Sequence, residues 1–363
     1  ERQARQPDAR LAEFLRLTFD QMAARGLRDH VGGGFFRYTV DPGWDTPHFE
    51  KMLYDNAHLA MLYLRAASVL RQPRYREIAR GTLDFMQEEL LDASGGFYSS
   101  TSAVDDKGRE GATYLWEPDE LKRQLSPEAY AAVRRVWRLD AARGFEAGYL
   151  PAEYNTPTAD ERRLLTEAAR TLRPLRRARS LPKDDKLNAG LNGLALSAFS
   201  QAISLDPAYR PHADRLQRFL LTRLVRDGRL MKAMARGQLL PHAELEDYAY
   251  VVQGLLDHAE ATGNPQSRDQ ARQLARVAWQ TFWSEKGWKQ EARPLLATLQ
   301  AEPALADGAL YSPSEVLILA TLRLRDPALR RLARTAAGWR SPAMEQDAYG
   351  HPTRVRVLAQ VRN

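Results

Sequence analysis

The chain of 363 residues is long enough for one large domain or two modest ones, and no apolar run approaches the ~18 residues of a membrane span. It has no cysteine, which excludes disulfides, thiol nucleophiles and thiolate metal sites but leaves both the cytoplasm, which we favour, and the periplasm open. The net charge is +7, yet arginine dominates the basic residues along the whole chain, and its densest cluster lacks interleaved aromatics. The charge therefore does not indicate a nucleic-acid-binding protein.

The first feature in chain order is the stretch DHVGGGFFRYTVDPGWDTPHFEKMLYDNA, residues 29–57, which crowds aromatic rings, histidines and acids around three consecutive glycines. No strand pattern precedes these glycines and no Lys-Ser or Lys-Thr pair follows them, so they do not indicate a phosphate-binding P-loop. We expect them to supply backbone conformations closed to other residues and to allow close packing.

Four strongly apolar segments predict buried helices at residues 50–70, 186–205, 244–262 and 314–325. Each is followed by a proline turn and an amphipathic segment, and proline is favoured in the first turn of a helix. Together with Pro127, these turns recur about every 60 residues, a period typical of stacked or circularly arranged hairpins. The alternation of helix types predicts an all-α barrel with an inner and an outer ring; an open α-solenoid is the alternative.

In such a barrel the starts of the inner helices share one end with the glycine-rich loops that follow the outer helices. We expect this end to form an open mouth from residues 29–56, 95–116, 144–155, 183–192, 228–248, 287–291 and 307–315. Helix N-termini carry a partial positive charge, which favours anionic or hydroxyl-rich ligands at the mouth.

Three motifs resemble signatures of the spermatogenesis-associated protein 20 family: the stretch 29–57, RSLPKDDKLNAGLNGLALSA at 179–198 and LEDYAYVVQGLLDHAEATGN at 245–264. The resemblance implies an (α/α)6 toroid of the six-hairpin glycosidase superfamily, which includes N-acylglucosamine 2-epimerases and unsaturated glucuronyl hydrolases. It also implies a thioredoxin-like domain upstream. Residues 1–363 would then hold the barrel as a single domain, with its first hairpin incomplete.

The chain departs from the family pattern in a loop at the expected mouth. Ser102 and Val104 stand where family members usually carry the two acids of Asp-Ala-Asp, and Leu191 replaces the usual tryptophan before Asn-Gly-Leu. The loss of two carboxylates from this loop favours changed or lost chemistry.

Three candidate residues lie near the start of the first predicted inner helix. Asp55 and Glu50 are five residues apart, roughly 140° around a helix. Asp55 sits in an apolar run, so we expect it to face the barrel axis as a general acid or base; a stabilising charge at a helix N-terminus is the alternative for both acids. His48 is a candidate proton carrier or a structural histidine, and its H-x-E pattern offers too few ligands for a metal.

The same stretch offers candidates for ligand binding. Arg37 is suited to clamp a carboxylate or sugar hydroxyls, or to pair with Asp41 or Asp55 and hold the loop. Tyr38 and Trp44 are candidates for stacking on sugar rings, and packing in the core is their alternative.

The second predicted inner helix follows a pair of acids. One of Asp184 and Asp185 is expected to cap the helix that begins near Lys186. The other is expected to project into the mouth with Lys186 and Asn192.

One hairpin later, Asp247 and Tyr248 repeat this arrangement, and such a pair suits glycoside hydrolysis or proton abstraction beside a carbonyl. The sequence thus predicts a sugar-directed enzyme without metal or cofactor. Its proposed groups are the carboxylates Asp55, Asp185 and Asp247, the proton carriers His48 and Tyr248, and the binding residues Arg37, Tyr38, Trp44, Glu50, Lys186 and Asn192.

Two alternatives remain to the enzyme hypothesis. One is a catalytically degenerate module that binds a carbohydrate or a peptide and works with a thioredoxin-like domain in cis or in trans. The other is a structural domain whose loops only pack. We expect neither a nucleic-acid nor a membrane partner.

Overall fold

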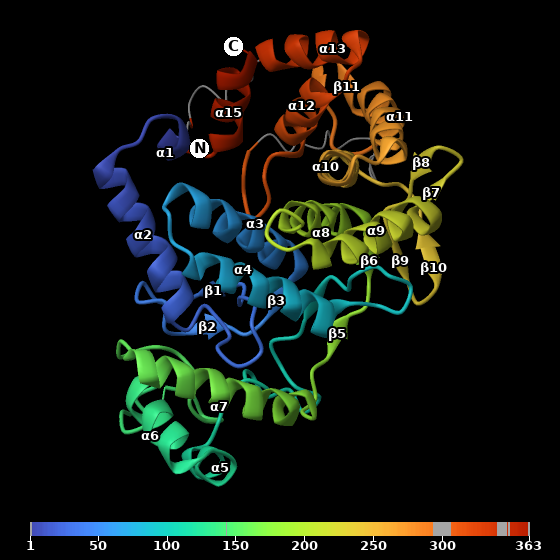
Figure 1. Ribbon diagram of the computed structural model, residues 1–363. Helices are drawn as coiled ribbons and strands as arrows, with labels where there is room; N and C mark the ends of the chain where they lie inside the picture. Colours follow the sequence, from blue (N-terminus) through green and yellow to red (C-terminus); the bar gives the residue numbers. More distant parts are fainter. Residues whose placement is uncertain (1, 143, 293–305, 340–346, 348, 362–363) are drawn as a thin grey trace. The chain divides into compact units, whose positions relative to one another are not determined.

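The computed structural model describes residues 2–142, 144–292, 306–339, 347 and 349–361 (Figure 1). The chain divides into two compact units. Unit 1 consists of residues 1–90 and 100–184, and unit 2 of residues 91–99 and 185–363. No helix among the described residues is both long and apolar enough to cross a bilayer.

Unit 1 is built from helices joined by loops with very short strands. Its helices are α1 (Arg2–Arg5), α2 (Ala9–Ala24), α3 (Leu53–Val69), α4 (Arg74–Phe85), the π-helical turn η1 (Met86–Leu90), α5 (Pro118–Gln124), α6 (Pro127–Val136) and α7 (Ala159–Arg177). Its strands are β1 (Tyr38–Thr39), β2 (Pro47–His48), β3 (Lys51–Met52), β4 (Ser100–Thr101) and β5 (Lys183–Asp184).

Unit 2 repeats the helical hairpin. Its helices are α8 (Ala189–Ala202), η2 (Pro207–Tyr209), α9 (Arg210–Phe219), η3 (Leu220–Leu224), α10 (Leu245–Thr262), α11 (Pro265–Phe282), α12 (Pro313–Arg323), α13 (Pro327–Gly338) and α15 (Pro352–Val361). Its strands are β6 (Leu187–Asn188), β7 (Val225–Arg226), β8 (Arg229–Leu230), β9 (Ala233–Ala235), β10 (Gln238–Leu240), β11 (Trp283–Ser284) and β12 (Gly287–Trp288).

The four predicted buried helices are confirmed as α3, α8, α10 and α12, each followed by an amphipathic partner. In α8 nearly every side chain is buried, which explains why its sequence is apolar around the whole circumference. The prolines act as predicted: Pro127, Pro265 and Pro327 occupy the first turns of α6, α11 and α13.

Two helix starts differ from the sequence prediction. Residues 50–52 and 186–188 precede α3 and α8 in extended conformation, because β3 and β6 pair with strands from later loops. In unit 1, β4 lies between β3 and β5, with Lys51 opposite Thr101 and Thr101 opposite Lys183. In unit 2, β9 lies between β6 and β10. The strands thus hold several of the predicted mouth loops together within each unit.

A repeated side-chain anchor fixes the start of three inner helices. Asn56, the fourth residue of α3, accepts a 2.7 Å hydrogen bond from the Phe35 amide and donates to the Phe35 carbonyl at 3.1 Å. Asn192, the fourth residue of α8, makes the same pair of bonds with Phe97, at 2.7 and 3.0 Å. In α10 the fourth residue is Tyr248, whose hydroxyl accepts a 3.0 Å bond from the Leu230 amide. Such anchors satisfy buried backbone groups that would otherwise be costly.

Candidate functional site

The third residue is an acid in three of the four inner helices, and in α3 and α10 it directly precedes the anchor residue. These acids are Asp55 in α3, Asp247 in α10 and Glu315 in α12, and Leu191 takes the equivalent place in α8. Burial raises the pKa of each acid to about 7. Glu315 was not among the candidates predicted from the sequence, because the acids share a position only when the helices are aligned by their observed starts.

Two of the three acids have partners for their charge. Asp247 accepts hydrogen bonds from the amides of Gly190 at 3.1 Å and Glu244 at 3.0 Å, so it joins the starts of α8 and α10. Glu315 accepts from the Arg354 guanidinium at 3.1 and 3.4 Å. Both acids are almost fully buried, and their hydrogen bonds to other parts of unit 2 indicate that they stabilise the structure.

Asp55 differs from its two counterparts. Its Oδ2 is buried, and within the described parts of the chain it has no hydrogen-bond partner. Burial is the largest cause of its raised pKa; the Arg37 guanidinium opposes that effect and the Glu50 carboxylate adds to it. A buried polar atom without a partner is a candidate for contact with a ligand or substrate.

The surroundings of Asp55 form a compact polar group with Arg37, Glu50 and Tyr54. Arg37 donates a hydrogen bond to Glu50 at 2.9 Å. Its ion-pair partner is therefore neither Asp41 nor Asp55, the two partners considered from the sequence. Burial raises the pKa of Tyr54, with Asp55 adding to the rise and Arg37 opposing it. Because Glu50 precedes β3, the predicted angle between two helical acids does not apply to it.

This group has the properties of a proton-transfer site. A carboxyl with a pKa of about 7 is present in both protonation states at neutral pH, so it can accept a proton and return it. Arg37 is half-exposed and presents further N–H donors that suit a hydroxyl or carbonyl oxygen. We call Arg37, Glu50, Tyr54 and Asp55 the Asp55 cluster.

His48 and Tyr38 lie opposite each other on β2 and β1, and their rings stack at 5.0 Å. His48 lines a cavity of about 740 Å³ together with Phe49, Glu110 and other unit 1 residues. Its buried Nδ1 has no hydrogen-bond partner among the described residues. His48 therefore stays a candidate proton carrier, whereas the ring of Tyr38 has one face covered by the imidazole.

Several other predicted site residues have structural positions instead. Trp44 packs against the core of unit 1 and has a left-handed backbone with a φ of 63°, so its ring is mainly a packing group. Asn192 is 0% exposed and cannot project into a mouth, because its amide holds Phe97. Tyr248 is buried and its hydroxyl binds Leu230. These positions favour packing for Trp44 and backbone anchoring for Asn192 and Tyr248, while contact with substrate stays an untested prediction for all three.

The acid pair before α8 also differs from the prediction. Asn188 caps α8, its side chain accepting from the Leu191 amide at 3.2 Å, because the helix starts at Ala189 and not near Lys186. Asp184 belongs to β5. Asp185 is exposed and lies 3.6 Å from Arg236, and Lys186 is exposed as well.

A buried ionic group was missed from the sequence. Lys51 is 0% exposed, donates to Asp29 at 2.5 Å and to the Gly33 carbonyl at 2.9 Å, and lies over the Phe85 ring at 4.3 Å. Arg176 joins Asp29 to Glu89 from α7. This group explains why Gly32 is required, since a Cβ there would overlap the Arg176 guanidinium. The sequence did not reveal this ionic group, because its four charged residues come from four distant segments of the chain.

Solved structures show the class of fold. A D-mannose isomerase superposes with a TM-score of 0.53 at 11% identity, over 89% of this chain and 68% of the isomerase. A cellobiose 2-epimerase from Bacillus thermoamylovorans superposes with a TM-score of 0.54 at 11% identity, over 94% of this chain and 73% of the epimerase. The chain therefore has the (α/α)6 toroid fold that the family resemblance implied, in agreement with the all-α barrel that the helical hairpins predicted.

Sequence relatives identify the family. Human spermatogenesis-associated protein 20 is 30% identical over 330 residues, and the rat protein of the same name is 32% identical over 330 residues. Each alignment covers 78% of this chain and 42% of the relative, so the chain matches less than half of these proteins. The chain belongs to the spermatogenesis-associated protein 20 family, as its motifs predicted. No protein-family model matches it.

Proposed function

We propose that this chain is a carbohydrate-directed protein that transfers a proton to and from a sugar through Asp55. The observation that carries the proposal is the unpartnered, buried Oδ2 of Asp55, whose two counterparts at the same helix position are occupied by internal bonds. The likeness of the fold to that of a D-mannose isomerase and a cellobiose 2-epimerase supports a sugar as the ligand.

Isomerase or epimerase chemistry fits the Asp55 cluster best. In that reaction the ionised carboxyl removes the proton from the carbon beside a carbonyl, and the same carboxyl, now protonated, returns it to the sugar. Arg37 is placed to donate to the sugar oxygen on which negative charge develops. Glycosidase chemistry requires a second carboxyl beside the first, and Glu50 is the available candidate in unit 1.

The test is incorporation of solvent deuterium into sugars. The protein is incubated in D₂O with a panel of aldoses and disaccharides, and the carbon-bound deuterium is measured by NMR. We expect incorporation with the wild type and with Asp160→Asn, an exposed control on α7, but a loss of at least about 100-fold with Asp55→Asn. Equal incorporation by Asp55→Asn would contradict the assignment of Asp55.

A binding module without turnover is the second candidate. Ser102 and Val104 favour it, because two acids that the family usually carries are absent from this loop, and the Ser102 hydroxyl accepts from the Val104 amide at 3.1 Å. In this case a thioredoxin-like domain would supply the chemistry. The same sugars would then raise the melting temperature of the wild type without deuterium exchange, and the rise would be lost in Arg37→Ala.

A further inference from the structure

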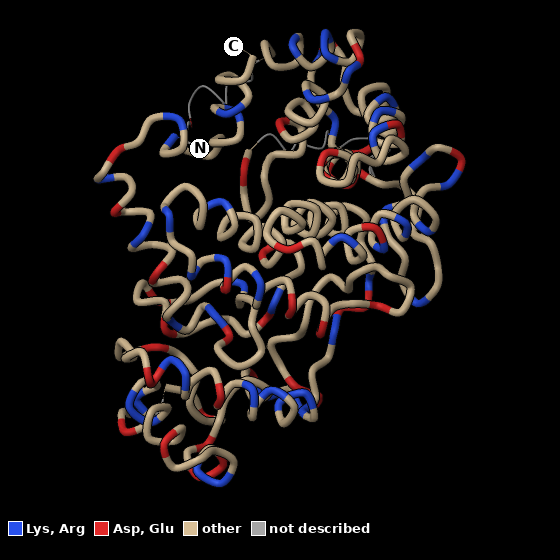
Figure 2. The backbone as a smooth tube through the Cα atoms, in the orientation of Figure 1, with Lys and Arg blue, Asp and Glu red and all other residues tan. Residues whose placement is uncertain are grey.

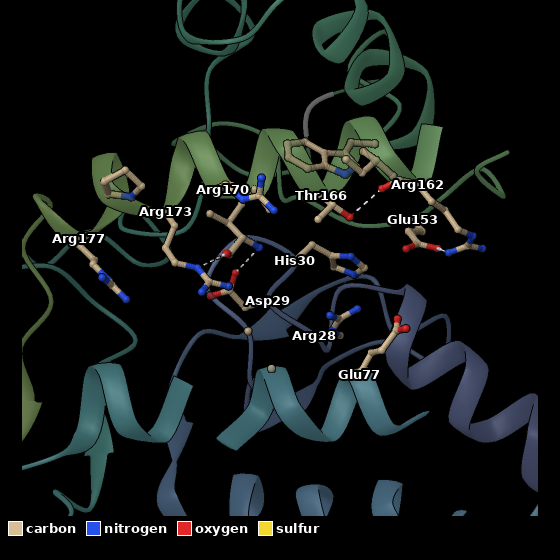
Figure 3. A pocket seen from close by; sticks show the side chains of 17 residues that line it. Arg28, Asp29, His30, Glu77, Glu153, Arg162, Thr166, Arg170, Arg173 and Arg177 are labelled. Atoms are coloured by element: carbon tan, nitrogen blue, oxygen red, sulfur yellow. Dashed lines mark hydrogen bonds and ion pairs between the residues drawn. The ribbon is translucent and has the colours of Figure 1, made fainter. Parts of the chain in front are cut away.

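Unit 1 contains a cavity of about 520 Å³ (Figure 3). None of its lining residues belongs to the Asp55 cluster. One wall is a face of α7, and the other is formed by residues 28–33 with two positions on α4. We call it the arginine pocket, because its lining includes Arg28, Arg162, Arg170, Arg173 and Arg177. Its volume falls in the range of small-molecule sites.

The arginines follow the periodicity of α7. Positions 162, 166, 169, 170, 173 and 177 recur at three- and four-residue spacing, so one face of the helix presents them together. Figure 3 shows side chains of α7, among them Arg162, Arg170 and Arg173, above Arg28 and Glu77, and Figure 2 shows basic positions along α7. The cavity therefore has guanidinium groups on both walls.

One of the three acids in the lining is compensated by cations outside it, and a second by a lining arginine. Asp29 is held by Lys51 and Arg176, which point to it from outside the cavity lining. Glu153 lies 3.5 Å from Arg162. Five arginines against three acids leave the lining with an excess of positive charge. Glu88, outside the lining, forms ion pairs with Arg173 and Arg177.

Two of the lining arginines form no ion pair with a carboxylate of the described residues. Arg170 is exposed to the cavity, and among the described residues no carboxylate forms an ion pair with it or with Arg28. Arg28 makes one long hydrogen bond, 3.4 Å to the Ala23 carbonyl. Burial lowers its pKa, with Glu153 the strongest opposing charge, yet a guanidinium stays protonated at neutral pH. Arg173 donates to the Val31 carbonyl at 3.2 Å.

A glycine in the middle of α4 leaves the cavity open. Gly81 lies inside the helix, where glycine costs about 1 kcal/mol relative to alanine. A Cβ at Gly81 would meet no atom within 4 Å, so packing does not demand the glycine there. Trp137 and Leu165 supply apolar surface in the same lining.

We propose that the arginine pocket binds the phosphate of a small phosphorylated molecule, with Arg28 and Arg170 contacting the phosphate from the two walls. Planar guanidinium groups match phosphate oxygens in bidentate geometry, and the apolar surface from Trp137 and Leu165 suits the remainder of a compact ligand. This site is separate from the proposed proton transfer at Asp55.

The experiment is calorimetric titration with glucose 6-phosphate, inorganic phosphate and, as the neutral counterpart, glucose. We expect Arg170→Ala to weaken binding of the phosphorylated sugar about 10- to 100-fold and Gly81→Leu to abolish it by filling the cavity. Arg123→Ala, at an exposed arginine of the same unit outside the cavity, leaves it unchanged. If inorganic phosphate binds as tightly as the sugar phosphate, free phosphate is the ligand.

Four outcomes would overturn the proposal. They are the absence of saturable binding of either phosphate up to about 10 mM, equal binding by Arg170→Ala, unchanged binding by Gly81→Leu, and glucose binding as tightly as its phosphate. Asp55→Asn separates the two sites: it should leave phosphate binding intact even if the proposed sugar chemistry is absent. Loss of binding in Asp55→Asn, without loss in Arg170→Ala, would assign the ligand to the Asp55 cluster.

Discussion

At the scale of single residues, equivalent helix positions carry acids with different tasks. Asp55, Asp247 and Glu315 share a position and a pKa raised to about 7 by burial, but only Asp55 has a buried oxygen with no partner in the described structure. The shared helix position therefore does not determine what each acid does. The hydrogen bonds from Gly190 to Asp247 and from Arg354 to Glu315 distinguish these two structural acids from the candidate catalyst Asp55.

The Asp55 carboxyl predicts a specific dependence of stability on pH. Its folded pKa lies above the unfolded value, so its contribution to stability is fully present below about pH 4 and is lost as the pH rises through about 7. Asp55→Asn cannot ionise, and we expect it to be more stable than the wild type by about 1–3 kcal/mol at pH 8 and nearly equal at pH 4. Urea unfolding at both pH values measures this, and a variant less stable at pH 8 would show that the ionised carboxyl is stabilised.

Asp247 occupies the same position in α10, but we expect its truncation to destabilise the protein. Asp247→Ala leaves the amides of Gly190 and Glu244 buried without an acceptor, and we expect a loss of about 2–4 kcal/mol at pH 6. Asp55→Ala is its matched control and should cost less than about 1 kcal/mol. Similar losses in chemical denaturation of the two variants would argue against different roles for the two acids.

At the scale of elements, the inner helices are predictable and their attachments are not. An apolar circumference and a following proline are local properties, so α3, α8, α10 and α12 could be recognised from the sequence. The strands before α3 and α8 could not, because β3 and β6 exist only through pairing with segments some 50 residues away. The helix starts were therefore placed a few residues too early, and Asp184 or Asp185 was assigned a cap that Asn188 supplies.

The anchor at the start of α8 makes a prediction at this scale. Asn192→Ala removes both bonds to the Phe97 backbone and a bond to the Asn188 carbonyl, leaving buried groups unsatisfied. We expect a loss of about 2–4 kcal/mol and faster hydrogen exchange at the Phe97 amide. Asn56→Ala should have the same effect at the Phe35 amide, since the geometry is repeated. Unchanged exchange in both variants would refute the anchor.

At the scale of the whole molecule, periodicity and motif predicted the class of fold and the family, whereas the candidate site was predicted only in part. Asp55, Arg37 and Glu50 were identified and lie together in unit 1. Asn192, Tyr248 and Trp44 have structural partners that the sequence did not predict, because polar and aromatic side chains next to glycine-rich loops serve backbone anchoring and packing equally well. Only the network of partners separates these roles, and that network depends on tertiary structure.

If Asp55 transfers a proton to and from a sugar, its carboxyl must titrate near neutral pH and respond to the bound ligand. The most direct measurement is a carbon-13 NMR titration of the aspartate carboxyl groups in the wild type and in Asp55→Asn. We expect a signal with a midpoint near pH 7 that disappears in the variant and moves when a sugar binds. A carboxyl of Asp55 that titrates near its ordinary value of about 4, with no response to any sugar, would contradict it.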